Sequence, residues 1–100
     1  MLKITKYERP DAATLQLEGS VTGPWVHEFQ QAWRSVAASL GSRKFFVDLR
    51  GVTQMNSVAR ELLAEIYKNT GAEFIANTPM IKYFAEEAKH RIEHDNEEGK

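Results

Sequence analysis

The run from Phe45 to Leu63 constrains the fold more than any other part of the chain. Its first residues, 45–49, are apolar apart from one aspartate, which is typical of a buried strand. A short turn follows, and an amphipathic helix begins around Asn56 and Ser57. A phosphate is tolerated on a hydroxyl at a helix start, because unpaired backbone N–H groups and the positive end of the helix dipole point toward it. If the chain carries a switch, we expect it at Ser57.

Alternating apolar and polar residues predict two strands in the N-terminal part of the chain. The first covers residues 2–6, and the second covers residues 14–18 and ends at Gly19. A turn over residues 9–12, which contains a proline, would join them. We therefore expect an antiparallel hairpin with one buried face.

Apolar residues at steps of three and four predict three helices. The first begins at Pro24 and ends near Gly41, the second covers residues 57–70 and ends at Gly71, and the third begins at residues 78–79. We expect the first helix to bury a stripe against the sheet: Trp25, Phe29, Trp33, Val36 and Leu40. The corresponding buried face of the third helix is Met80, Ile81, Phe84, Ala88 and Ile92.

Two further short strands, at residues 44–49 and 73–76, complete the order β-β-α-β-α-β-α. Strand–helix–strand units of this length require parallel pairing with a right-handed crossover. The fold class is therefore α/β, a small mixed sheet with helices packed on it. We expect one domain over residues 1–94 and a polar C-terminal tail over residues 95–100 that frays.

Composition excludes several classes of function. The net charge of −1 in 100 residues gives no reason to expect a nucleic acid or an anionic membrane as partner. The absence of cysteine excludes disulfides and thiolate chemistry and fits a reducing compartment. No apolar run approaches the ~20 residues of a membrane span, and the N-terminus lacks the apolar core of a signal peptide. We therefore expect a cytoplasmic protein that does not bind membranes directly.

The sequence does not predict an enzyme. A nucleophilic Ser57 would need a histidine base and an acid within hydrogen-bond reach, and the Gly-x-Ser-x-Gly elbow is absent. All three histidines fall on predicted helix surfaces. There is no Gly-rich phosphate loop, so we expect neither a nucleotide nor another cofactor.

The end of the last predicted helix mixes both charges. His90 and His94 are four residues apart, with Glu86 one turn earlier, a spacing that can place ligands on one face. Without a third strong ligand we expect a solvated helix end and no metal site. Glu87 and Arg91 are spaced to pair along the same helix.

The order of elements and the local sequence together resemble the STAS domain family, the fold of bacterial anti-sigma-factor antagonists. The resemblance covers roughly Leu2 to Ala88. In that family a strand like 45–49 is followed by a turn, a hydrophobic residue and Asp-Ser/Thr-x-Gly opening a helix. The runs 70–76 and 78–84 resemble the family's helix exit with its following strand and the start of its last helix. The residues that match the central motif are Met55, Asn56, Ser57, Val58 and Ala59.

The resemblance implies a non-catalytic module for signal transduction through protein–protein interaction. In the family, the residue at the position of Ser57 is phosphorylated by a partner kinase that also sequesters a sigma factor, and phosphorylation releases the antagonist. A phosphoserine adds nearly two negative charges to the contact surface. The partner-binding residues that we expect here are Met55, Asn56, Ser57, Val58 and Arg60.

The chain departs from the family motif around the acceptor hydroxyl. Asn56 stands where the family has aspartate, and Ala59 stands where it has glycine. Arg60 and Glu61 replace small apolar residues. These departures bear on the kinase reaction and leave the fold unaffected. The alternative function is a subunit of an ABC-type lipid-transport complex bound to its ATPase, in which Ser57 only caps its helix. Either function is compatible with a weak homo-oligomer.

Overall fold

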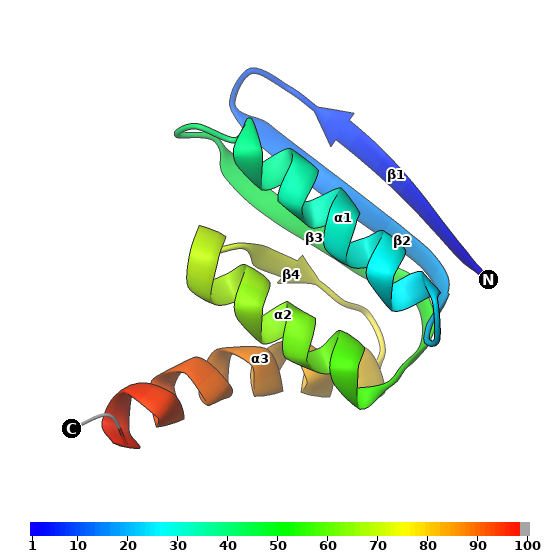
Figure 1. Ribbon diagram of the computed structural model, residues 1–100, viewed down its shortest axis with the longest axis vertical. Helices are drawn as coiled ribbons and strands as arrows, with labels where there is room; N and C mark the ends of the chain where they lie inside the picture. The colour runs from blue at the N-terminus through cyan, green and yellow to red at the C-terminus, as the bar shows by residue number, and fades with distance from the viewer. Residues whose placement is uncertain (99–100) are drawn as a thin grey trace.

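Four strands and three helices follow one another in the predicted order (Figure 1). The computed structural model describes residues 1–98, and describes side chains for residues 1–90. The elements are β1 (Leu2–Glu8), β2 (Ala12–Val21), α1 (Trp25–Ala38), β3 (Lys44–Met55), α2 (Ser57–Thr70), β4 (Glu73–Ile75) and α3 (Pro79–Glu98). The strands form one sheet in the order β1-β2-β3-β4. The predicted α/β fold with a small mixed sheet is confirmed.

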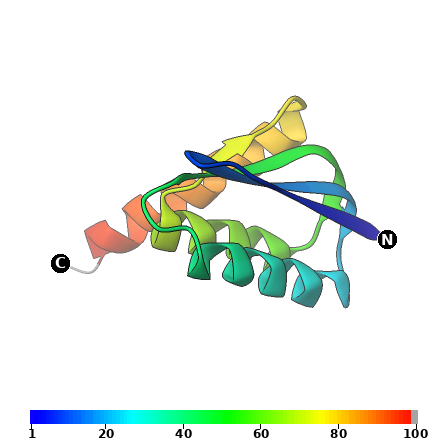
Figure 2. The ribbon, with the colours of Figure 1, turned by 90° about the horizontal axis from the view of Figure 1, so that it is seen from above.

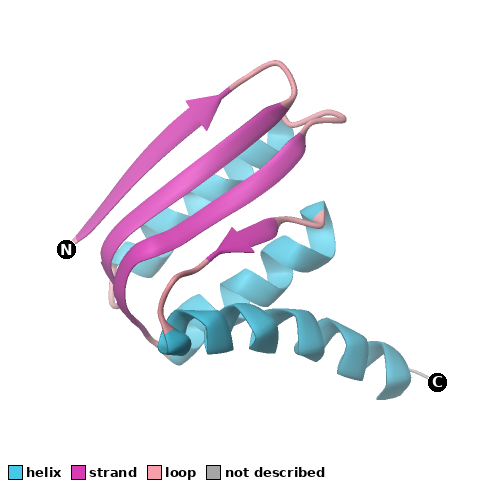
Figure 3. Ribbon diagram, turned by 180° about the vertical axis from the view of Figure 1, so that it is seen from behind, coloured by secondary structure: helices cyan, strands magenta, loops and turns pink. Residues whose placement is uncertain are grey.

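The sheet combines a hairpin with two crossover units. β1 pairs antiparallel with β2, whereas β2 with β3 and β3 with β4 are parallel. The crossover helices α1 and α2 both lie under the same face of the sheet (Figure 2). The view from behind shows the opposite face of β1, β2 and β3 without a helix of the described chain over it, while α3 lies near β4 and α2 (Figure 3).

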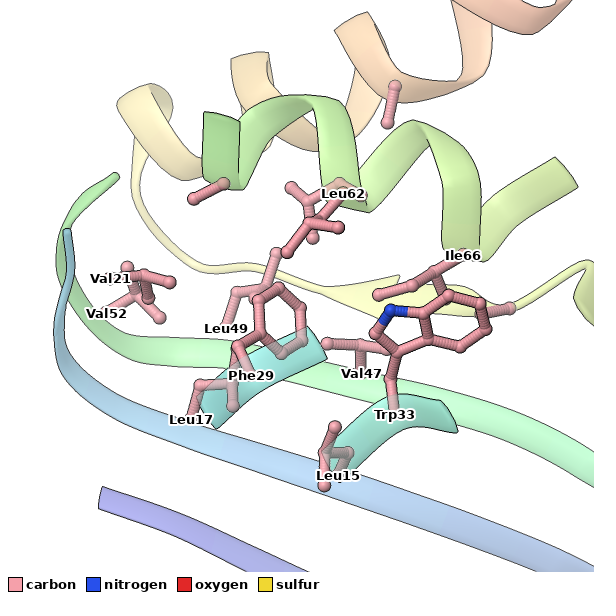
Figure 4. Close-up of a cluster of buried hydrophobic side chains, with 14 of the residues drawn as sticks. Leu15, Leu17, Val21, Phe29, Trp33, Val47, Leu49, Val52, Leu62 and Ile66 are labelled. Atoms are coloured by element: carbon pink, nitrogen blue, oxygen red, sulfur yellow. The ribbon is translucent and has the colours of Figure 1, made fainter. Parts of the chain in front are cut away.

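The core fills the space between the sheet and the two crossover helices (Figure 4). Alternate residues of β2 and β3 point into it, as period-two patterning requires. On the other side of the core, α1 and α2 contribute large side chains that are almost or fully buried. Complete burial of each aliphatic or aromatic side chain contributes about 1.5–3 kcal/mol. The central members are Leu15, Leu17, Val47, Leu49, Phe29, Trp33, Leu62 and Ile66.

The predicted stripe of α1 is confirmed, because Phe29, Trp33 and Val36 are buried and Trp25 packs against the core at its edge. The predicted face of α3 is confirmed only in part, and the side chain of its last member, Ile92, lies outside the described residues. Ile81 is buried, but Met80 is exposed. Met80 precedes Ile81 in the first turn of α3 but lies on the side of the helix that is open to solvent.

Three strands are longer than predicted, and the first of them, β1, continues to Glu8. β2 passes through Gly19, which has a φ of 106°, and continues to Val21. A β-carbon at Gly19 would overlap the carbonyl oxygen of Met1, so this glycine allows the start of β1 to approach. β3 continues past Leu49 because shifts of register against β2 absorb extra residues there.

The other boundaries agree with the sequence patterns more closely. α2 has the predicted bounds, and Gly71 ends it with a φ of 66°. α1 stops at Ala38, ahead of Gly41. The segment predicted to fray, 95–100, lies partly within α3, which runs to Glu98, and partly outside the described residues. Among the helices of the described chain, none has the length and apolar character that a membrane crossing requires.

Candidate functional site

Ser57 stands where the chain leaves the sheet and enters α2. The carboxyl ends of β2 and β3 lie side by side, with Val21 paired to Met55, and the backbone N–H of Asn56 donates to the carbonyl of Val21 at 3.3 Å. The start of α2 is therefore near the loop 22–24 that leads from β2 into α1. Loops at the carboxyl ends of parallel strands are where open α/β sheets usually place their binding residues.

Asn56 caps α2, and Ser57 does not. Asn56 has extended backbone angles, φ −84° and ψ 177°, and its Oδ1 accepts a hydrogen bond from the N–H of Ala59 at 2.9 Å. Its carbonyl accepts from the N–H of Arg60 at 3.1 Å. Ser57 is the first helical residue, and its hydroxyl makes no hydrogen bond with the described side chains or backbone. The capping role considered for Ser57 is therefore wrong.

Three of the five predicted contact residues lie at an accessible surface. Ser57 is exposed, Asn56 is partly exposed, and Val58 leaves 51% of its surface open to solvent. Met55 does not lie at this surface as predicted, because only 6% of it is exposed. It points from the last position of β3 into the core and supports the helix start from below, so it cannot offer contact area to a partner.

Arg60 is partly exposed, and its guanidinium is engaged within the domain. Its Nε donates to Oε1 of Glu87 at 2.9 Å, and its Nη2 donates to Oε2 at 2.6 Å. The same guanidinium lies 4.5 Å above the ring of Phe84. The hydrogen bonds to Glu87 raise the pKa of Arg60, against a smaller opposing effect of burial. Arg60 thus fastens α2 to α3.

Glu87, which its spacing would allow to pair with Arg91 along α3, has both carboxylate oxygens engaged by Arg60. The side chain of Arg91 lies outside the described residues. Sequence spacing could not reveal the actual pair, because its members are 27 residues apart and on different helices.

The start of α3 exposes two large apolar side chains that sequence patterns did not assign to a site. Met80 is 46% exposed and Tyr83 is 61% exposed, both in the first two turns of α3. In the view of Figure 3 both α2 and α3 begin near the same end of the sheet. The sequence patterns had assigned Met80 to the buried face of the last helix and had given Tyr83 no role.

A second polar group lies in the middle of β3. Asp48 is buried, and its carboxylate accepts three hydrogen bonds from Arg50. The donors are the backbone N–H, Nε and Nη2 of Arg50, at 3.1, 3.0 and 2.9 Å. These bonds lower the pKa of Asp48, although burial acts in the opposite direction. The pair sits where β3 loses register with β2, so it stabilises an irregular strand.

Metal binding finds no support among the described side chains, where histidine, aspartate and glutamate form no group of three suited to an ion. His90 is exposed near the end of these residues. The side chain of His94, the other histidine of the predicted helix end, lies outside them.

Comparison with solved structures identifies the fold. The chain is similar to the crystal structure of an anti-sigma factor antagonist from Mycobacterium paratuberculosis, with a TM-score of 0.70 and 21% sequence identity over 79% of this chain and 70% of that chain. The fold is STAS-like. The fold that the sequence resemblance implied is therefore confirmed.

Two crystal structures of Mglu are also similar, with TM-scores of 0.57 and 0.58 and identities of 20% and 17%. They match 75% and 73% of this chain but only 19% and 23% of theirs, so the shared fold forms a small part of Mglu. No family model matches the chain, and no curated protein matches it. At these identities the likeness establishes a common fold.

Proposed function

We propose that the chain is a non-catalytic regulatory module that binds a protein partner through the start of α2. The partner is a kinase of the anti-sigma type, and phosphorylation of Ser57 weakens the complex. The observation that carries the proposal is the position of Ser57: it is exposed, it is the first residue of α2, and its hydroxyl is outside the helix cap. The likeness to an anti-sigma factor antagonist supports the choice of partner.

The contact surface consists of Asn56, Ser57 and Val58. Val58 supplies an exposed apolar side chain beside the hydroxyl. Met55 supports this surface from the core, and Arg60 borders it with its charge already paired. A surface of this size fits a transient complex with a modest interface.

A phosphate on Ser57 affects the free and bound states differently. In the free protein, the first backbone N–H groups of α2 lack intrahelical partners and stabilise an anion. In the complex, nearly two added charges must be desolvated against the partner. Every 1.4 kcal/mol of lost interaction weakens binding about tenfold, so an unfavourable contact with one phosphate is enough for release.

The test is to replace Ser57 by aspartate and by alanine. Partners are captured with the unmodified chain, and the affinity of each variant is then measured by calorimetry. We expect Ser57→Asp to weaken binding at least about tenfold and Ser57→Ala to preserve it. The matched control is Ser42→Asp, which adds the same charge at an exposed serine in the turn between α1 and β3.

Equal binding by both Ser57 variants would contradict a phosphorylation switch. It would favour the second candidate, a permanent subunit of an ABC-type lipid-transport complex bound to its ATPase. One observation supports that candidate. Asn56 places a neutral amide next to Ser57, where the family motif has the carboxylate of an aspartate, and the oxygen of this amide is bound to the N–H of Ala59 in the helix cap. A tight complex that ignores charge at Ser57 is the outcome expected of such a subunit.

A further inference from the structure

We infer that Arg60 couples phosphorylation of Ser57 to the position of α3. Phosphoserine at position 57 would draw the guanidinium of Arg60 away from Glu87 and loosen α3 from α2. This inference rests on the proposed phosphorylation of Ser57 and adds a structural consequence to it. The kinase transfers the γ-phosphoryl group of ATP to Oγ of Ser57, forming the new P–O bond as ADP leaves and the hydroxyl proton is released.

The first step in the argument is the spacing along α2. Ser57 and Arg60 are three residues apart in one helix, so their side chains are neighbours on its surface, with β-carbons about 5–6 Å apart. Arginine has a long, flexible stem and can reach a group on the preceding turn. A phosphate on Ser57 would therefore lie within reach of Arg60 without any movement of the backbone.

The second step is the present engagement of Arg60. Its two hydrogen bonds to Glu87 join α2 to α3, and its guanidinium covers the ring of Phe84. The side chains of Arg60 and Glu87 are 27% and 20% exposed. The pair is thus accessible enough to exchange partners, yet sheltered enough for its loss to affect how α3 packs.

The third step is the competition between two anions for one guanidinium. Phosphoserine carries about −1.5 to −2 charges and three strong acceptor oxygens, whereas Glu87 carries one charge. Arginine forms bidentate bonds with phosphate as readily as with carboxylate. The phosphate would also repel the negatively charged carboxylate of Glu87. Attraction of Arg60 and repulsion of Glu87 both favour separation of the helices.

The consequence concerns the exposed surface at the start of α3. Phe84 loses the guanidinium that covers it, and the exposed residues Met80 and Tyr83 move with the first turns of α3. Phosphorylation would therefore alter the shape of the start of α3 as well as the charge at the start of α2. A partner that contacts both helix starts would lose contacts on α3 that lie away from the phosphate itself.

The experiment installs phosphoserine at position 57 during translation with an expanded genetic code, so no kinase has to be known. Amide hydrogen exchange of residues 84–88 and the Nε–H resonance of Arg60 are then followed by NMR. We expect exchange in this part of α3 to accelerate by about tenfold or more, with a shift of the Arg60 resonance. Unmodified protein with Glu87→Gln should show the same acceleration.

The matched backgrounds are Arg60→Gln and Arg34→Gln. Arg34 also reaches toward α2, where it pairs with Glu65 at 3.7 Å, but it has no part in the proposed coupling. Phosphorylation should accelerate exchange in the Arg34→Gln background and produce no further acceleration in the Arg60→Gln background. An unchanged Arg60 resonance, unchanged exchange, or an equal response in both backgrounds would overturn the inference.

These measurements separate the coupling from the proposed function. Partner affinity is not among the readouts, so a chain that never meets a kinase can still show the coupling. If phosphoserine loosens α3 but Ser57→Asp and Ser57→Ala bind the partner equally, the proposed function fails and the coupling stands. If binding responds to Ser57 while α3 stays protected, the coupling fails and the function stands.

Discussion

The cap of α2 yields the sharpest prediction about stability, because the structure assigns it to one of two adjacent polar residues. Asn56→Ala removes the acceptor of the 2.9 Å hydrogen bond from the N–H of Ala59. Loss of such a cap costs about 1 kcal/mol, within a range of roughly 0.5–2. α2 contributes Leu62, Leu63 and Ile66 to the core, so its weakening should appear in the global unfolding free energy.

Ser57→Ala should behave differently. Its hydroxyl takes part in no hydrogen bond with the described residues, and alanine is at least as good a helix former. The expected change in unfolding free energy is within about 0.5 kcal/mol of zero. Asn56→Asp keeps the acceptor oxygen and adds a negative charge at the helix start, so it should leave stability unchanged or raise it by up to about 1 kcal/mol.

The assay is urea unfolding monitored by circular dichroism, with thermal melts as a second measurement. For a chain of this size, a loss of 1 kcal/mol lowers the melting temperature by roughly 4–8 °C. The reasoning is refuted if Ser57→Ala costs as much as Asn56→Ala, because the cap would then involve the hydroxyl. It is equally refuted if Asn56→Asp is as unstable as Asn56→Ala, since the acceptor oxygen would then have no effect.

Three other features lead to quantitative expectations. A double-mutant cycle with Arg60→Gln and Glu87→Gln, measured by urea unfolding, should give a coupling of about 1 kcal/mol, and additive single effects would show that the pair does not stabilise the domain. The lowered pKa of Asp48 means that its contribution is present above the unfolded value of about 3.9 and is lost as pH falls through the lower folded value, so Asp48→Asn should flatten the acid limb of a stability–pH curve. Gly19→Ala should destabilise by more than about 1 kcal/mol, because of its positive φ and the overlap with Met1, and a melting temperature equal to that of the unmodified chain would contradict this.

Local patterns predicted the elements of this fold well, for physical reasons that can be traced to particular residues. The bounds of α2 could be predicted because Asn56 before the helix and Gly71 after it are local signals whose effects do not depend on the rest of the fold. The stripe of α1 could be predicted because apolar side chains at helical spacing must be buried together. The preference of parallel strand–helix–strand connections for right-handed crossovers then left few possible arrangements of the sheet.

The ends of β2 and β3 could not be predicted from local sequence, because they depend on strand pairing. β2 continues through Gly19 because the start of β1 lies against it, and β3 extends to Met55 because bulges accommodate its pairing with β2. Neither condition appears in the local sequence. The burial of Met55 follows from the same extension of β3, so a residue that seemed to belong to an exposed turn became part of the core.

Local sequence patterns were enough to predict the order of elements, the stripe of α1 and the placement of Ser57 at a helix start, since each depends on interactions between residues close in the chain. That Arg60 binds Glu87 and lies over the ring of Phe84 could be learned only from the folded chain, because Arg60 and Glu87 are 27 residues apart and on different helices. The choice of Asn56 over Ser57 as the cap is local, because the hydrogen bond from Ala59 spans only three residues, but the sequence patterns had left both residues as candidates. Packing selects among the partners that a polar side chain could take, and that selection is a property of the whole fold.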